Sequence, residues 1–183
     1  MQLFYGFAFL LLLSVSAIGG LLAFQASERS SMESQRVGTL LKTVELTRGD
    51  LYRQLKEVFD FHFLQDADAD VEFDELGKRS QTHFKTLQKL AVTDEERIAI
   101  EELIKTYQTV NNTIIKIMSL QRGQIPQSEK LVLLDTELEG ENLSDLEAAF
   151  GATEHLFVVA QSELQSNVKH LIQTALALYY CLF

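Results

Sequence analysis

The chain has 183 residues, of which 46% are hydrophobic and 23% are charged, and its formal net charge is −10. This composition suits one folded domain rather than a disordered tail, and the single cysteine, Cys181, leaves no internal disulfide framework and no cysteine metal site. The acidic balance, with basic residues scattered among acidic ones, argues against a nucleic-acid-binding surface, because phosphate binding needs clustered Lys and Arg.

The first predicted element is an apolar helix from Leu3 to Phe24. It has 22 residues, and no charged residue occurs before Glu28. At about 1.5 Å per residue it measures roughly 33 Å, enough for a hydrocarbon core of about 30 Å. A cleaved signal peptide ending near Ala17 is the alternative, but the apolar stretch exceeds a usual signal core and no positive charge precedes it. We therefore expect an uncleaved transmembrane helix within residues 1–27.

An amphipathic helix is predicted to follow without a break, because apolar residues recur with helical spacing from Val37 to Phe61. Four of them lie on a strict seven-residue step: Val37, Val44, Leu51 and Val58. Ser30 and Glu33 would instead start a new helix if they form a capping box. After a turn near residues 65–70, apolar positions between Phe73 and Leu90 predict a second helix.

The acidic stretch DADADVEFDE, residues 66–75, lies at this turn and holds six acids and no base. Alternating Asp residues could supply oxygen ligands to Ca²⁺, but the spacing of an EF-hand loop is not met. We interpret the stretch as a turn followed by a first helical turn, where carboxylates suit the positive end of the helix. No metal site and no cofactor are predicted.

The clearest predicted helix start is the motif LAVTDEER. Thr93 is the expected N-cap and Glu96 the third helical residue, so the two form a capping box. The third helix then runs with helical apolar spacing to Met118. The sequence QRGQIPQ, which contains Gly123 and Pro126, ends it.

A last helical region is predicted to open at Ser128. It is either continuous or interrupted near Gly140, where Ser144 and Glu147 form a second capping box. Beyond that point, helical positions step by three and four without a miss: Leu143, Leu146, Phe150, Thr153, Phe157, Ala160, Leu164, Asn167, Leu171, Thr174 and Leu178. The final 13 residues, 171–183, are apolar but too few to span a bilayer. We expect a second membrane helix that is interrupted by the end of the chain.

The predicted fold class is all-α: a membrane-anchored, up-down-up-down four-helix bundle whose first and last helices continue into transmembrane segments. The predicted domains are an N-terminal transmembrane helix (1–27), an extracytoplasmic bundle (28–170) and a truncated second transmembrane helix (171–183). From Leu131 to Val168 there are eight acids and no base, whereas the first bundle helix carries several bases. Charge pairing between the first and last helices is expected.

No catalytic constellation is present, so no catalytic residue and no enzyme activity is predicted for these residues. His62 and His83 would lie near the same end of an antiparallel pair and could join an acid as a proton or metal sensor; otherwise they are packing residues. Arg48 replaces an apolar residue on the stripe and could bind a carboxylate ligand in a bidentate manner, or else extend along a helix edge. Asn111 and Asn167 are candidate polar core positions.

These features resemble the sensory input region of bacterial two-component histidine kinases and methyl-accepting chemotaxis receptors. The resemblance is carried by the span Leu3 to Phe24, the LAVTDEER motif with its flanking helices, and the heptads from Leu143 to Leu178. It implies a four-helix sensor domain outside the cytoplasmic membrane, homodimeric through the bundle, with a small molecule or protein as ligand. It also implies that a stimulus shifts one membrane helix relative to another and changes the output of a kinase.

The function expected from the residues and the resemblance is therefore the membrane-anchored input domain of a two-component sensor histidine kinase. The phosphorylated histidine motif and the ATP-binding motifs of such a kinase are not in these residues. A chemoreceptor sensor domain is one alternative. A secreted or periplasmic helical binding protein released by signal cleavage is another, and a membrane adaptor that assembles through its heptads is a third.

Overall fold

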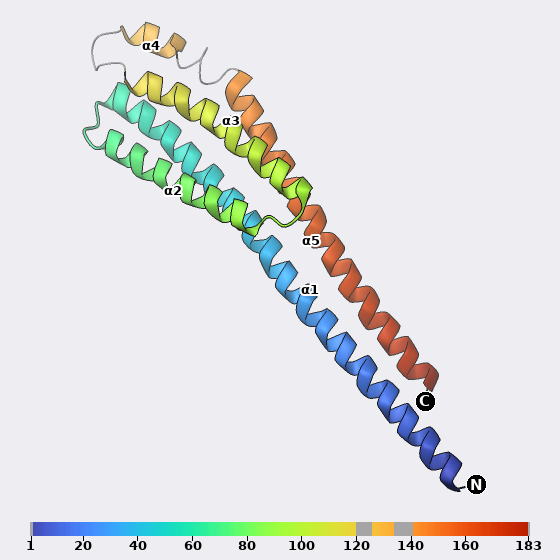
Figure 1. The fold of residues 1–183 in the computed structure, drawn as a ribbon. Coiled ribbons are helices and arrows are strands. Elements are labelled where there is room, and N and C mark those ends of the chain that lie inside the picture. The colour runs from blue at the N-terminus through green and yellow to red at the C-terminus, as the bar shows by residue number, and fades with distance from the viewer. Residues whose placement is uncertain (1, 120–125, 134–140, 183) are drawn as a thin grey trace. The chain divides into compact units, whose positions relative to one another are not determined.

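The computed structural model describes residues 2–119, 126–133 and 141–182 of the chain, and within these ranges every regular element is a helix (Figure 1). The elements are α1 (Gln2–Phe59), a π-helical turn η1 (Asp60–Leu64), α2 (Ala69–Leu90), α3 (Asp94–Met118), the short α4 (Gln127–Leu133) and α5 (Glu141–Leu182). The expectation of an all-α protein with four long helices is confirmed.

The chain divides into two compact units. Met1–Val37 and Ala160–Phe183 make one, which we call the terminal unit, and Gly38–Val159 make the other, which we call the bundle unit. The bundle unit holds the second part of α1, all of α2, α3 and α4, and the first part of α5. The sites discussed below lie within one unit or the other.

The core of the bundle unit is built from one apolar face of each long helix. On α1, the heptad residues Val44, Leu51 and Val58 are all 0% exposed, as the seven-residue step predicts. The other helices contribute Phe73, Leu76, Phe84, Leu87, Ile100, Leu103, Tyr107, Val110, Ile114, Ile117, Leu146, Phe150 and Phe157. Periodic apolar faces of this kind bury themselves against one another, and this burial is the main source of stability for such helices.

Each long helix has two long helices as neighbours in the bundle unit. The rings of Phe84 on α2 and Tyr107 on α3 pack edge to face with centroids 4.9 Å apart. Thr153 Oγ1 on α5 lies 3.4 Å from the carbonyl oxygen of Ala99 on α3. Side chains of α1 contact α2 on one side and α5 on the other, as described below. The four helices therefore enclose a single core.

The reversal from α1 to α2 occurs where the sequence predicts it. After the π-helical turn, Gln65 adopts a left-handed backbone conformation with φ of 57°, and the amide of Asp66 donates to the carbonyl of Asp60 over 3.2 Å. The amide of Asp68 then donates to the Asp66 carboxylate over 3.0 Å. A residue other than glycine rarely adopts a left-handed backbone conformation. The sequence therefore does not identify Gln65 as the residue at which the helix ends.

The capping box at the start of α3 is confirmed. The amide of Glu96 donates to Thr93 Oγ1 over 3.1 Å, and the Glu96 carboxylate accepts the amides of Thr93 and Val92 over 3.2 and 2.7 Å. Three backbone donors at the helix start are thus satisfied, which fixes the sharp turn between α2 and α3.

The other two proposed capping boxes do not start helices. Ser30 and Glu33 lie inside α1, which continues unbroken through them, and Glu33 binds Arg36 Nε at 2.9 Å. Ser144 lies inside the first turn of α5, and Glu147 contacts α1 instead of the backbone at Ser144. A Ser-x-x-Glu pattern also occurs within helices, where apolar periodicity decides the outcome. Gly123 and Gly140 lie outside the described residues.

Within the part of the chain that the structure describes, no helix has the length and apolar character needed to cross a membrane. The backbone of residues 3–24 is helical, but most side chains of both predicted spans lie outside the described residues. The predicted stripe on α5 is confirmed in its first part, where the stripe residues are buried: Leu146, Phe150, Thr153 and Phe157. Farther along, Leu164 is half-buried and Asn167 is exposed, so the proposal of Asn167 as a polar core residue is wrong.

Candidate functional site

A line of polar side chains is buried along α1 in the bundle unit. Its members alternate spacings of four and three residues, which keeps them on one helical face: Thr43, Thr47, Asp50, Gln54 and Glu57. None of them is more than 6% exposed. We call these five residues the polar seam. Burying polar groups costs free energy unless hydrogen bonds or opposite charges compensate them, so the seam depends on its partners.

The threonines of the seam are satisfied within α1. The hydroxyls of Thr43 and Thr47 donate to the carbonyls four residues earlier, those of Thr39 and Thr43, each over 2.7 Å. Asp50 and Gln54 instead find partners on other helices, whereas the carboxylate of Glu57 pairs within α1. Glu57 lies beside Lys56, whose Nζ is 3.3 Å from Glu57 Oε1.

Asp50 joins α1 to α2. Its side chain is 3% exposed, and Arg79 Nη2 donates to its Oδ1 over 2.6 Å. Its Oδ2 lies 3.3 Å from Nε2 of His83, within ion-pair distance but without hydrogen-bond geometry. Arg53, one turn along α1, reaches Oδ1 at 3.8 Å. A carboxylate this deeply buried is stable only with such opposite charges around it.

Gln54 joins α1 to both α2 and α3. Its Nε2 donates to the carbonyl of Phe73 over 3.3 Å, and its Oε1 accepts the hydroxyl of Tyr107 over 2.6 Å. Gly77 allows this approach, since a Cβ at that position would lie 3.1 Å from Gln54 Nε2. Burial raises the pKa of the Tyr107 hydroxyl, and the charge of nearby Asp50 adds to the increase.

The Tyr107→Phe substitution is expected to lower the free energy of unfolding by about 1 to 2 kcal/mol near pH 8, because Gln54 Oε1 loses its buried donor. The pKa of Tyr107 is higher in the folded chain than the ordinary tyrosine value of 10.0. Above about pH 10 the unfolded chain therefore releases this proton while the folded chain retains it, and stability falls as the pH rises. The phenylalanine of the variant cannot titrate. The difference in free energy of unfolding between the two proteins, measured by urea denaturation, should therefore become smaller between about pH 9 and 11. A difference that grows with pH would contradict this assignment.

Arg48 joins α1 to α5. Its Nη1 lies 2.8 Å from Glu154 Oε1 and its Nε lies 3.6 Å from Glu147 Oε2. The guanidinium carbon is 5.0 Å from the centre of the Phe150 ring, a distance suited to a cation–π contact. Phe150 lies between the two glutamates in sequence, so one arginine spans two turns of α5. The expected charge pairing between the first and last helices of the bundle is confirmed.

Tyr52 supports the same contact one turn along α1. Its hydroxyl donates to Glu147 Oε1 over 2.9 Å. This hydrogen bond, together with partial burial and the charge of Glu147, raises the pKa of the Tyr52 hydroxyl. The carboxylates at Arg48 in the structure are those of this chain, so a carboxylate ligand would have to displace one of them.

The two histidines do not share a site. His62 lies in η1, is buried, and its Nε2 is 3.0 Å from the carbonyl oxygen of Ile117 at the end of α3. His83 lies beside Asp50 instead. Since Asp50 precedes His62 by twelve residues along α1 and η1, the two positions are separated by roughly 18 Å. His83 meets an acid, as the sensor hypothesis requires.

Several residues of this site were not singled out from the sequence: Asp50, Gln54, Gly77, Arg79 and Tyr107. A usable signal was present, because Thr43, Thr47, Asp50, Gln54 and Glu57 run parallel to the apolar heptad on α1. A line of polar residues on a helix usually faces solvent, so the sequence alone favours an exposed position for these five side chains. Their burial depends on α2 and α3, which the periodicity of α1 does not reveal.

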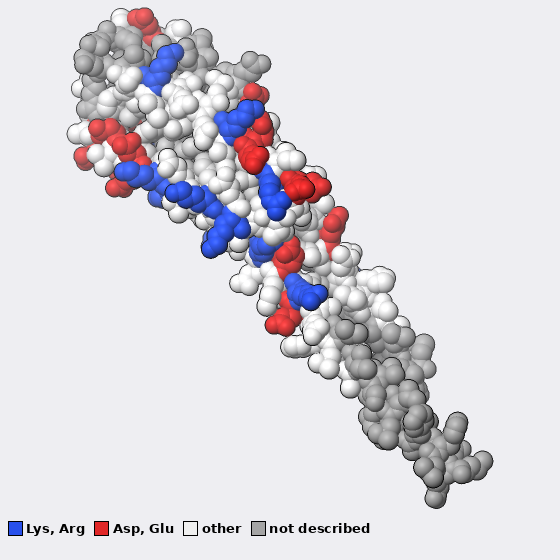
Figure 2. Space-filling model, viewed as in Figure 1, with Lys and Arg blue, Asp and Glu red and all other residues white. Residues whose placement is uncertain are grey.

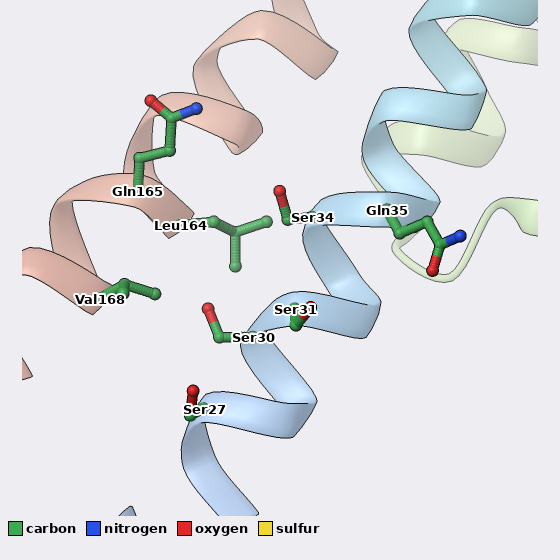
Figure 3. Close-up of a pocket in the computed structure, with 8 residues that line it drawn as sticks. All are labelled: Ser27, Ser30, Ser31, Ser34, Gln35, Leu164, Gln165 and Val168. Carbon is green, nitrogen blue, oxygen red and sulfur yellow. The ribbon is translucent and has the colours of Figure 1, made fainter. Parts of the chain in front are cut away.

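The terminal unit contains a groove of 570 Å³ between α1 and α5. Figure 3 shows serine side chains of α1 on one side and Leu164 and Val168 of α5 on the other. The lining residues are Ser27, Ser30, Ser31, Ser34, Gln35, Leu164, Gln165 and Val168. None of them carries a charge, so the groove offers no group for acid–base chemistry or for pairing with an ionic ligand.

The described residues contain no group of three or more His, Cys, Asp or Glu side chains that could hold a metal ion. The chemistry available at the polar seam and at Arg48 is therefore ion pairing and hydrogen bonding between helices. Searches against models of protein families, against curated proteins and against solved structures found no match to this chain.

Proposed function

We propose that this chain is the input region of a membrane-anchored signalling receptor, of the kind that regulates a histidine kinase. In this proposal, the apolar ends anchor the chain in the cytoplasmic membrane and the bundle unit lies outside the cytoplasm as part of a homodimer. A stimulus, such as a small molecule or a protein, changes the packing of the bundle and so shifts α1 relative to α5 by about 1 to 2 Å.

The observation that carries this proposal is the contact of Arg48 with α5. α1 and α5 are the two helices that continue into the apolar ends of the chain. Within the bundle unit, Arg48 lies between two carboxylates, close to Glu154 and farther from Glu147. Its Nε is buried and has no hydrogen-bond partner, although Glu147 is only 3.6 Å away.

This geometry suits a sliding contact. A small displacement of α5 along α1 would bring Glu147 into hydrogen-bonding range of Arg48 and move Glu154 out of it. One strong charge-assisted bond is replaced by another, so the two arrangements are close in energy. A stimulus that favours either arrangement by a few kcal/mol would then shift the population between them.

The test joins residues 1–183 to the kinase half of a receptor with a measurable output. Regulated output in membranes is the expected result. Glu154→Gln should shift the basal output by about fivefold, since it weakens one of the two arrangements by about 1 kcal/mol. Glu147→Gln should shift the basal output in the opposite direction, because it weakens the other arrangement.

Glu101→Gln is the matched control, because Glu101 is exposed on α3, whereas both carboxylates that pair with Arg48 lie on α5. This control should leave the output unchanged. An output that stays constant under every variant and every stimulus would leave the sensor proposal without support. Complete extraction of the full chain from membranes by alkaline carbonate would argue against the anchor itself.

A further inference from the structure

The C-terminal part of α2 and the turn after it carry basic residues without any acid. Residues 76–93 contain Lys78, Arg79, Lys85 and Lys89 and no Asp or Glu, in a chain whose net charge is −10. The bases of this protein are thus not all scattered among acids, contrary to the first interpretation of the sequence. Figure 2 shows a row of Lys and Arg along α2, with Asp and Glu gathered toward one end of it.

The three lysines lie along one exposed line of the helix. Lys78, Lys85 and Lys89 are separated by seven and four residues, which places them within a narrow arc of α2. Their spacing along the helix axis is about 10 Å and about 6 Å. All three are exposed. We call this line the lysine row.

Two arginines flank the lysine row on the side of α1. The side chains of Arg79 and Arg53 are 52% and 64% exposed, and both lie near Asp50. The side chain of Asp50 is only 3% exposed. It pairs with the two arginines from inside the bundle and does not present a carboxylate to an approaching ligand. Asp74 and Glu75 are exposed one turn before Lys78, so the surface is locally positive from Lys78 toward the C-terminal end of α2.

We propose that the lysine row binds a linear anionic polysaccharide that lies along α2. A polymer with an anionic group on each repeat can meet ammonium groups spaced along a line, and it gains by releasing counterions as it binds. The repulsion from acids elsewhere on the chain is screened beyond about 10 Å at 0.1 M salt. This inference does not depend on the proposed signalling role or on a membrane anchor.

The side chains of this surface favour a polysaccharide over a single-stranded nucleic acid. Proteins that bind single strands combine a basic groove with exposed aromatic rings on which bases stack. The one aromatic residue within residues 76–93 other than His83 is Phe84, which is 6% exposed and packed on Tyr107. The row supplies charge without a stacking surface.

The experiment measures binding of fluorescein-labelled polygalacturonate to the full chain in nonionic detergent, by fluorescence anisotropy at about 0.1 M salt. Lys85→Gln/Lys89→Gln is expected to weaken binding by about tenfold or more. The matched control, Lys105→Gln/Lys116→Gln on α3, removes the same net charge and should change affinity by less than about twofold. Lys85→Arg/Lys89→Arg keeps the charge and should keep the affinity.

The result that would overturn the proposal is an equal loss of affinity in the two glutamine variants, since binding would then follow net charge alone. Absence of binding by the wild-type chain would also refute it. Tighter binding of a labelled thymidine 20-mer than of polygalacturonate would identify a nucleic acid surface instead. Thermal melting of each variant, in the same detergent, shows that the comparison is made between folded chains.

Discussion

Replacing Phe157 with Asp is expected to unfold the bundle unit. Phe157 is 0% exposed and lies on the buried face of α5, four residues after Thr153 and seven after Phe150. Removing a buried Phe side chain costs about 3 to 5 kcal/mol. A carboxylate without a buried partner adds a further penalty of several kcal/mol. The sum is comparable to the whole stability of a small domain, which is about 5 to 15 kcal/mol.

The adjacent residue provides the control. Val158 is 52% exposed on the same helix, so Val158→Asp introduces the same carboxylate into solvent and should change stability by less than about 0.5 kcal/mol. Thermal melting followed by circular dichroism at 222 nm distinguishes the two variants. Equal melting of Phe157→Asp and the wild-type chain would show that the core face of α5 has been assigned wrongly.

The helices of this protein were predictable because their apolar residues recur with the helical period. The seven-residue step through Val44, Leu51 and Val58 is buried along its whole length. Thr93 was also predictable, since a capping box is a local signal that does not depend on the rest of the fold. The helical period and the capping box can each be recognised within a single segment of sequence.

Features that depend on two segments could be predicted only in part. The excess of acids after Leu131 and of bases on α1 predicted that these helices attract each other, but Arg48 was chosen as a ligand-binding residue and its actual partners on α5 were not named. The stripe on α5 keeps its period past Phe157, yet Leu171 is 53% exposed. Periodicity shows which face could be buried, and only a neighbouring helix decides whether it is.

The polar seam is the strongest case of this kind. Asp50 looks like a surface residue in the sequence, because an isolated buried carboxylate would be very costly. It is buried because Arg79 reaches it from α2 while keeping its own head half in solvent. The pair is therefore asymmetric: the acid is buried and the base is not.

This asymmetry predicts the order of stability in a set of variants. Arg79→Met should lower the free energy of unfolding by about 2 to 3 kcal/mol, because it leaves a buried carboxylate with only the weaker contacts of Arg53 and His83. Asp50→Val should cost much less, since the released arginine is hydrated and the buried charge is gone. The double variant should resemble Asp50→Val, so that Arg79→Met costs almost nothing once the acid is absent.

Urea denaturation midpoints of the four proteins measure this coupling directly. An equal cost of Arg79→Met with and without Asp50 would mean that Arg79 acts through the packing of its methylene groups and not through the carboxylate. If the coupling is found and Asp50→Val costs little, the ion pair adds little net stability, since a valine would serve the core nearly as well as the acid. We expect the acid to contribute register instead, because the ion pair between Asp50 and Arg79 favours the alignment of α2 on α1 in which the two side chains meet.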